Sequence, residues 1–212
     1  CSPTSAALFG IFLYQPSLSG SLFPVPMNVP LPTNEAERLV ALLRYGVLDT
    51  ESEQAFDDLA ALAAQVCATP IGLITLLATE RLWFKANIGL DGVREVPRDA
   101  AMCSYAILTP DQPLVVPDTL LDERFANSPL VLGEPYIRFY AGAPLVTPDG
   151  YVLGSLCVID QTPRTLTDQQ LQALRILSRQ AASLLELRRN LAQLGEAHTL
   201  LAHNEQRYRV LA

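Results

Sequence analysis

Residues 137–160 constrain the fold more than any other stretch, because they read as two strands joined by a tight turn. Along 137–145 apolar residues alternate with others, which is the period of a strand with two different faces. Pro148 presets φ for the second turn position, and Gly150 supplies the positive φ that closes a bulged hairpin. Residues 152–159 are apolar on both faces, so we expect this strand near the centre of a sheet covered on both sides.

The segments before the hairpin alternate between helical and extended patterns. Apolar periodicity predicts helices over 35–45 and 52–67, strands over 71–77 and 82–90, a short helix over 99–108 and a strand over 114–118. We expect 91–97 to be loop and 119–136 to be a long connection that is functional or carries a short helix. This order predicts an α/β (α+β) fold with an antiparallel five- or six-stranded sheet and helices on one face.

A long helix is predicted from Thr167-Asp168, because no glycine or proline follows until Gly195. One apolar stripe can pack on the domain: Leu171, Leu174, Ala181 and Leu185. A second stripe repeats at alternating spacings of four and three: Ala173, Leu177, Gln180, Leu184, Leu187, Leu191, Leu194, His198 and Leu201. Such a heptad pattern is typical of a coiled coil. We therefore predict that 167–203 is a signalling helix that forms a parallel homodimer.

Composition excludes several classes of function. The 212 residues carry a net charge of -7 with no run of Lys or Arg, which argues against a nucleic-acid partner. The four cysteines form no CxxC pair and both histidines lie near the C-terminus, so we expect no metal site, no disulfide framework and a cytoplasmic location. Residues 1–32 lack charge, and their apolar core is shorter than the roughly 20 residues of a membrane span. We expect an unstructured or non-native leader and no membrane insertion.

Several motifs in order resemble the GAF domain family, most closely GAF domains near the N-terminus of bacterial sensor proteins. The motifs are Glu35–Leu39 with Gly46–Thr50, Phe84-Lys85, Cys103 in its helix, Arg124–Asn127, Ile137–Leu145 and Gly154–Asp160. The resemblance covers about 34–190 and implies a GAF core over 34–166, with a ligand pocket on the sheet face opposite the helices. The pocket would be roofed by the Cys103 helix and the 119–136 connection.

The tail 204–212 is similar to the start of a PAS domain. GAF domains of this kind commonly precede a histidine kinase or a diguanylate cyclase. Their presence in two-component and related signalling systems implies that any catalytic output lies outside this chain.

The candidate ligand-binding residues are Arg138, Tyr140, Cys103, Trp83, Lys85, Asp118 and Phe125. Arg138 and Tyr140 share a strand face, where a guanidinium beside a phenol would bind an anionic or aromatic molecule. Alternatively, Arg138 pairs with Asp118 or Glu134 and only holds the connection in place. Trp83 and Lys85 share the polar face of their strand, where they line an edge of the pocket or cover the sheet.

Cys103 has three interpretations. Bilin-binding GAF domains typically have a histidine after the linking cysteine, whereas Ser104 follows here. A redox role is the second interpretation; its enzymatic form, a methionine-sulfoxide-reductase-like activity with Cys157 as the second thiol, would need an activating base that we do not see. The favoured interpretation is a buried inert thiol. We predict a sensory, non-enzymatic GAF domain without catalytic residues that binds an unidentified small ligand; a photosensor and a dimerisation scaffold with an empty pocket stay open.

Overall fold

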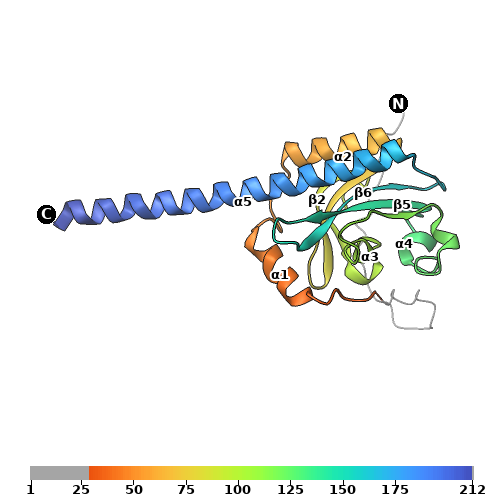
Figure 1. Cartoon of the computed structure of the whole chain (residues 1–212), viewed down its shortest axis with the longest axis horizontal. Coiled ribbons are helices and arrows are strands. Elements are labelled where there is room, and N and C mark those ends of the chain that lie inside the picture. The colour runs from red at the N-terminus through yellow and green to blue at the C-terminus, as the bar shows by residue number, and fades with distance from the viewer. Residues whose placement is uncertain (1–28, 212) are drawn as a thin grey trace, which may run out of the picture.

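The computed structural model describes residues 29–211, which form one layered domain and a projecting helix (Figure 1). The sheet has six strands in the order β3-β2-β1-β6-β5-β4, and every neighbouring pair is antiparallel. The strands are β1 (Ile71–Leu77), β2 (Arg81–Ile88), β3 (Glu95–Pro97), β4 (Leu114–Val116), β5 (Phe139–Val146) and β6 (Val152–Asp160). The predicted α+β sheet is thus confirmed, and β6 lies at its centre beside β1.

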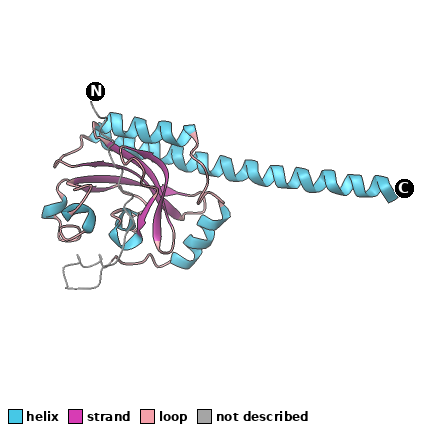
Figure 2. Ribbon diagram, turned by 180° about the vertical axis from the view of Figure 1, so that it is seen from behind, coloured by secondary structure: helices cyan, strands magenta, loops and turns pink. Residues whose placement is uncertain are grey.

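The hairpin formed by β5 and β6 closes as its residues predict. The amide of Gly150 donates to the carbonyl of Thr147 at 2.9 Å, and Gly150 has a φ of 86°. A register shift follows between Leu145 and Val146, which is the bulge expected of this turn. All nine residues of β6 are buried, because helices cover one face of the sheet and loops with short helices cover the other (Figure 2).

Helices α2 (Gln54–Cys67) and α5 (Asp168–Leu211) lie side by side on one face, and α1 (Glu35–Arg44) packs at its end (Figures 1 and 2). The other face carries α3 (Cys103–Ala106), α4 (Pro129–Leu132) and the 3-10 helices η1 (Arg98–Ala100) and η2 (Thr119–Leu121). The sheet therefore separates two apolar clusters. One contains Phe56, Leu156 and Leu174, and the other contains Phe84, Cys157 and Ile159.

Several boundaries differ from the sequence-based predictions. Strand β3 lies within 91–97, which we predicted as loop, because Arg81–Trp83 supply an edge to pair with. The predicted helix over 99–108 is split into η1 and α3, and the helix predicted from Ser52 begins at Gln54. The connection 119–136 does carry a short helix, α4.

Helix α5 is continuous over 44 residues and starts with a capping box between Thr167 and Gln170. Leu174, Ala181 and Leu185 are buried against the domain as predicted, whereas Leu177 of the second stripe is buried there too. Among the described side chains of α5, Leu185 is the last buried one; Arg188 and Arg189 still contact the domain, and the helix then projects away from it (Figure 1). It includes 204–211, where the PAS-like resemblance stays a prediction. The predicted leader, residues 1–32, falls mostly on 1–28, which lie outside the described residues.

No helix within residues 29–211 combines the length and the apolar character needed to cross a membrane. The same residues contain no group of three or more His, Cys, Asp or Glu placed to hold a metal ion.

Candidate functional site: an apolar pocket lined by Tyr140 and Cys103

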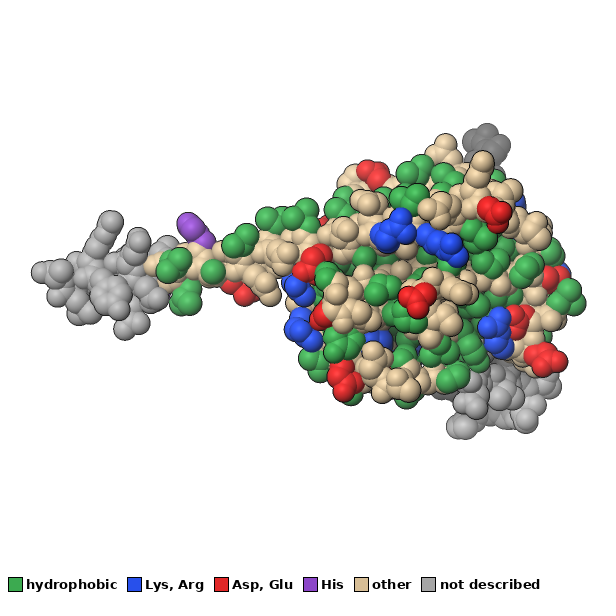
Figure 3. All heavy atoms as spheres, in the orientation of Figure 1, with side chains coloured by type: hydrophobic (Ala, Val, Ile, Leu, Met, Phe, Trp, Pro, Cys, Tyr) green, Lys and Arg blue, Asp and Glu red, His purple; other side chains and the backbone are tan. Residues whose placement is uncertain are grey.

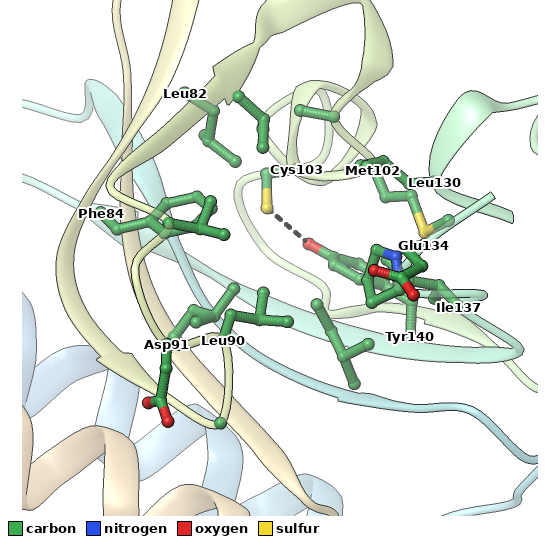
Figure 4. Close-up of a pocket in the computed structure, with 17 residues that line it drawn as sticks. Leu82, Phe84, Leu90, Asp91, Met102, Cys103, Leu130, Glu134, Ile137 and Tyr140 are labelled. Carbon is green, nitrogen blue, oxygen red and sulfur yellow. Dashed lines mark hydrogen bonds between the residues drawn. The ribbon is translucent and has the colours of Figure 1, made fainter. Parts of the chain in front are cut away.

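A pocket of about 370 Å³ lies on the sheet face opposite α2 and α5. It is bounded by β1, β2, β5 and β6 below and by the α3 and α4 segments above (Figure 4). Most of its lining is apolar: Leu73, Leu82, Phe84, Leu90, Val93, Val96, Ala101, Met102, Leu130, Pro135, Ile137 and Ile159. The volume falls in the usual range for small-molecule sites, which is about 300–1,000 Å³.

Tyr140 on the sheet side and Cys103 on the α3 side bring uncharged polar groups to the lining of the pocket. The Tyr140 hydroxyl donates to Cys103 Sγ at 3.3 Å (Figure 4). It lies flat along β5 because Gly142 has no side chain; a Cβ there would be 2.2 Å from the hydroxyl oxygen. Burial, and the neighbouring thiols Cys103 and Cys157, raise the pKa of Tyr140 well above its ordinary value, so the phenol stays protonated.

Behind Cys103 lies a second thiol. Cys103 Sγ and Cys157 Sγ are 3.9 Å apart, and both residues are buried. Ser155 Oγ lies 3.5 Å from the Tyr140 hydroxyl and 3.2 Å from Thr75 Oγ1. Hydrogen bonding from Cys157 lowers the pKa of Cys103 against the opposing effect of burial, and the surrounding hydroxyls act in the same direction. The pKa of Cys157 is raised, first by its hydrogen bond to Cys103 and then by burial.

The charged residues in the pocket lining are both acidic: Asp91 and Glu134. No Arg, Lys or His is found among the described residues that line it. This arrangement lacks the cations that would hold a phosphate or carboxylate.

Arg138 and Asp118 meet each other away from this lining. Arg138 Nε and Nη2 donate to the two carboxylate oxygens of Asp118 at 3.0 and 2.8 Å. The pKa of Asp118 is lowered, chiefly by this pairing. The ion pair between Arg138 and Asp118 agrees with the alternative interpretation, in which Arg138 holds the connection in place. Phe125 is also absent from the lining; it is fully buried with its ring 5.1 Å from that of Tyr105.

Lys85 and Trp83 lie outside the apolar pocket. The predicted alternation along β2 holds at Trp83, which packs in the helix-side cluster, and at Phe84, which lines the pocket. It breaks at Lys85, where a register shift between Ile74 and Thr75 places Ala86 in the helix-side cluster as well. Trp83 and Lys85 line a second hollow of about 720 Å³ beside residues 49–57, which shares Phe84, Asp91 and Val93 with the apolar pocket.

Lys85 belongs to an ion-pair network centred on Glu53, which we call the Glu53 network. Its Nζ donates to Glu53 Oε1 at 2.6 Å, and Arg188 Nε donates to the same oxygen at 2.9 Å. Arg188 also donates to the carbonyls of Tyr45 and Gly46. The network joins β2, whose Leu82 and Phe84 line the pocket, to the stretch of α5 that leaves the domain.

Sequence reasoning missed several lining residues, above all Phe84, Leu130 and Asp91. Leu130 could have been found, since Ser128-Pro129 is a helix N-terminus signature that places α4 within the connection. Ser128 Oγ indeed accepts from the Leu130 amide at 3.3 Å. Phe84 could also have been found, because alternation along β2 places it on the face opposite Trp83.

The fold combines a six-stranded antiparallel sheet, a ligand-sized pocket on one face and a long helix on the other. This architecture is typical of sensory regulatory domains. The GAF domain family matches residues 51–185, and this chain belongs to that family. A cyclic di-GMP phosphodiesterase of Pseudomonas aeruginosa is 47% identical over 135 residues, which are 64% of this chain and 23% of that protein. The chain thus spans about a quarter of the curated relative it matches.

Solved structures share the fold at low sequence identity. The GAF domain of a phosphoenolpyruvate-protein phosphotransferase from Coxiella burnetii is 14% identical with a TM-score of 0.56, covering 76% of this chain and 97% of that one. The PixJ GAF domain of Thermosynechococcus elongatus, in its blue-light-absorbing form, is 15% identical with a TM-score of 0.53, covering 77% and 96%.

Proposed function

We propose that this GAF domain binds a small molecule in the pocket and passes the signal through α5 to an output domain outside this chain. The observation that carries the proposal is the apolar pocket of about 370 Å³, built on the same central strand against which α5 packs from the other side. The domain acts in the cytoplasm as a regulatory input and has no catalytic role of its own.

The lining favours a different ligand chemistry from the one suggested by Arg138. Its two charged side chains are carboxylates, and the Arg138 guanidinium is engaged by Asp118. An anion would meet repulsion from Asp91 and Glu134, with no cation among the described lining residues to offset it. A mostly apolar molecule, neutral or carrying a cationic group, fits this lining best.

Native mass spectrometry of the freshly purified protein tests the ligand proposal. We expect an adduct of small-molecule mass that is absent under denaturing conditions. Val93→Trp should remove it, because Val93 lines the pocket and is exposed enough to accept a larger side chain without unfolding. Val40→Trp, at an exposed position on α1 outside the pocket, is the matched control and should keep the adduct. Retention of the adduct in Val93→Trp, or its absence from the parent protein, would contradict the proposal and favour an empty scaffold.

A parallel homodimer through α5 completes the proposed relay. Leu187, Leu191, Leu194 and Leu201 are exposed on the part of α5 beyond the domain, and hydrophobic side chains are visible along it in Figure 3. Their spacing of four, three and seven residues keeps them on one side of the helix. We expect these exposed leucines to pack against the same residues of a second copy of the chain and so to form a coiled coil.

Sedimentation of the full chain tests the dimer. Leu191→Lys combined with Leu194→Lys should shift the protein to monomer. Leu200→Lys is the control, because Leu200 is 63% exposed, close to the 60% of Leu191, yet lies off the stripe. Equal effects of the two changes, or no effect of the double variant, would refute the coiled coil.

The output domain proposed is a signalling enzyme. The relative from Pseudomonas aeruginosa is a cyclic di-GMP phosphodiesterase, and the family resemblance adds histidine kinases and diguanylate cyclases, with a PAS domain in between. Incubating the purified chain with cyclic di-GMP should leave the nucleotide intact; hydrolysis would show that the chain itself is catalytic.

A further inference from the structure

We propose that Cys103 and Cys157 form a reversible redox pair, in which a hydroperoxide entering the pocket oxidises Cys103 and Cys157 resolves it to a disulfide. The two sulfur atoms are 3.9 Å apart, on α3 and on the central strand β6. A disulfide has an S–S length of about 2.0 Å, so the sulfurs must approach by roughly 2 Å. We expect rotation of the side chains and a shift of the four-residue helix α3 to supply this movement.

The pocket gives the two thiols different roles. Cys103 is part of the pocket lining, whereas Cys157 is 0% exposed and lies behind it. A small oxidant can therefore reach Cys103 Sγ first. The local hydrogen bonds also favour this order, since they lower the pKa of Cys103 and raise that of Cys157. The thiolate is the nucleophile in such reactions, and the thiolate is favoured on Cys103.

The chemistry balances in two steps. The Cys103 thiolate attacks the terminal oxygen of the hydroperoxide; an S–O bond forms, the O–O bond breaks and the alkoxide leaves as an alcohol after taking a proton. Cys157 sulfur then attacks Cys103 sulfur; the S–S bond forms, the S–O bond breaks and the departing hydroxide takes the Cys157 proton as water. Together, the two thiols lose one electron pair, and this pair reduces the hydroperoxide to an alcohol and water. A thiol reductant restores the pair by exchange.

The third described cysteine is an internal control. Cys67 is buried in the cluster on the opposite face of the sheet, and burial raises the pKa of its thiol. It has neither a thiol neighbour nor a place in the pocket lining among the described residues. Because Cys67 is buried like the other two thiols but lacks a thiol neighbour and contact with the pocket, we expect peroxide to leave it unoxidised.

Intact-mass and peptide mapping test the proposal on the full chain carrying Cys1→Ser. The folded protein is exposed to hydrogen peroxide, denatured and alkylated with N-ethylmaleimide. We expect three maleimide adducts before oxidation and one afterwards, with a mapped Cys103–Cys157 linkage that dithiothreitol reverses. Cys157→Ser should stop at a sulfenic acid on Cys103, trapped by dimedone. Cys103→Ser should slow thiol loss by about tenfold or more, and Cys67→Ser should behave like the parent.

Three results overturn the inference. One is retention of all three thiols under peroxide that fully oxidises glutathione in the same tube. Another is a linkage that involves Cys67. The last is equal loss of disulfide formation in Cys67→Ser and Cys103→Ser. The measurement on the parent chain decides the question even where a variant fails to fold, which circular dichroism would reveal.

Discussion

Replacing Glu53 by glutamine tests the Glu53 network, which joins the pocket strand β2 to α5. The Lys85 side chain is 0% exposed, while that of Glu53 is 40% exposed. Breaking a fully buried pair costs about 3–5 kcal/mol, but solvent screening at Glu53 reduces this. Lys85 Nζ also keeps its bonds to the Glu51 carbonyl at 2.8 Å and to Thr50 at 3.1 Å. We therefore expect Glu53→Gln to lower the free energy of unfolding by about 2 kcal/mol at neutral pH.

The pH dependence of this loss separates charge from packing. Burial works to raise the pKa of Glu53, but its bonds to Lys85 and Arg188 outweigh burial, and the pKa falls below the ordinary 4.5. A carboxylate with a depressed pKa in the folded state stabilises the protein above its unfolded pKa, and this contribution disappears as the pH falls through the folded value. The difference between parent and Glu53→Gln should stay constant from neutral pH down to about 5.5 and shrink below about 4.

Urea denaturation followed by circular dichroism measures the effect as a lower midpoint with an unchanged slope. Glu51→Gln makes the same charge change two residues away at an exposed side chain and should stay within about 0.5 kcal/mol of the parent. A loss that is equally large in acid, or equal losses for the two variants, would refute the ion-pair argument.

Four further substitutions test the sheet, the long helix, the Tyr140 hydrogen bond in the pocket and the ion pair of Arg138. Gly154→Ala should destabilise by about 3 kcal/mol or more in urea denaturation, because its Cβ would lie 1.9 Å from the Thr75 carbonyl oxygen. Gly195→Ala meets nothing within 4 Å and should instead raise the helical circular dichroism signal. Tyr140→Phe should cost about 1 kcal/mol, measured in the same way, through its lost buried hydrogen bond. Arg138→Ala should leave the ligand adduct in native mass spectrometry unchanged, since Arg138 is outside the lining.

The sheet and the long helix could be predicted because local patterns determine them. The strand–turn–strand of 137–160 carries its alternation, its turn residues and its doubly apolar strand within one short stretch. The stripe through Leu174, Ala181 and Leu185 likewise follows helical spacing and is buried as expected. Such features need no knowledge of distant partners.

The pocket residues were harder to predict because their placement depends on register between strands. One bulge opposite Ile74 and Thr75 shifts the alternation of β2 after Lys85, so that Ala86 packs in the helix-side cluster, while Lys85 pairs with Glu53. The contact between Cys103 and Cys157 joins residues 54 positions apart, and only the packing of α3 on β6 brings their sulfurs together. The position of Arg138 next to the strand was likewise not enough to decide between a pocket residue and a partner of Asp118, with which it forms an ion pair.

Strand β6 offers the proposed signal a physical path from the pocket to α5. Its residues alternate between the two clusters, with Cys157 and Ile159 on the pocket side and Leu156 and Val158 on the helix side. Close-packed side chains transmit displacement because they have few voids to absorb it. In the proposed relay, a ligand against Ile159 or a disulfide at Cys157 would act on the backbone that also supports the α5 contact surface. We therefore expect both proposed inputs to act through this one strand and to change the register or rotation of α5.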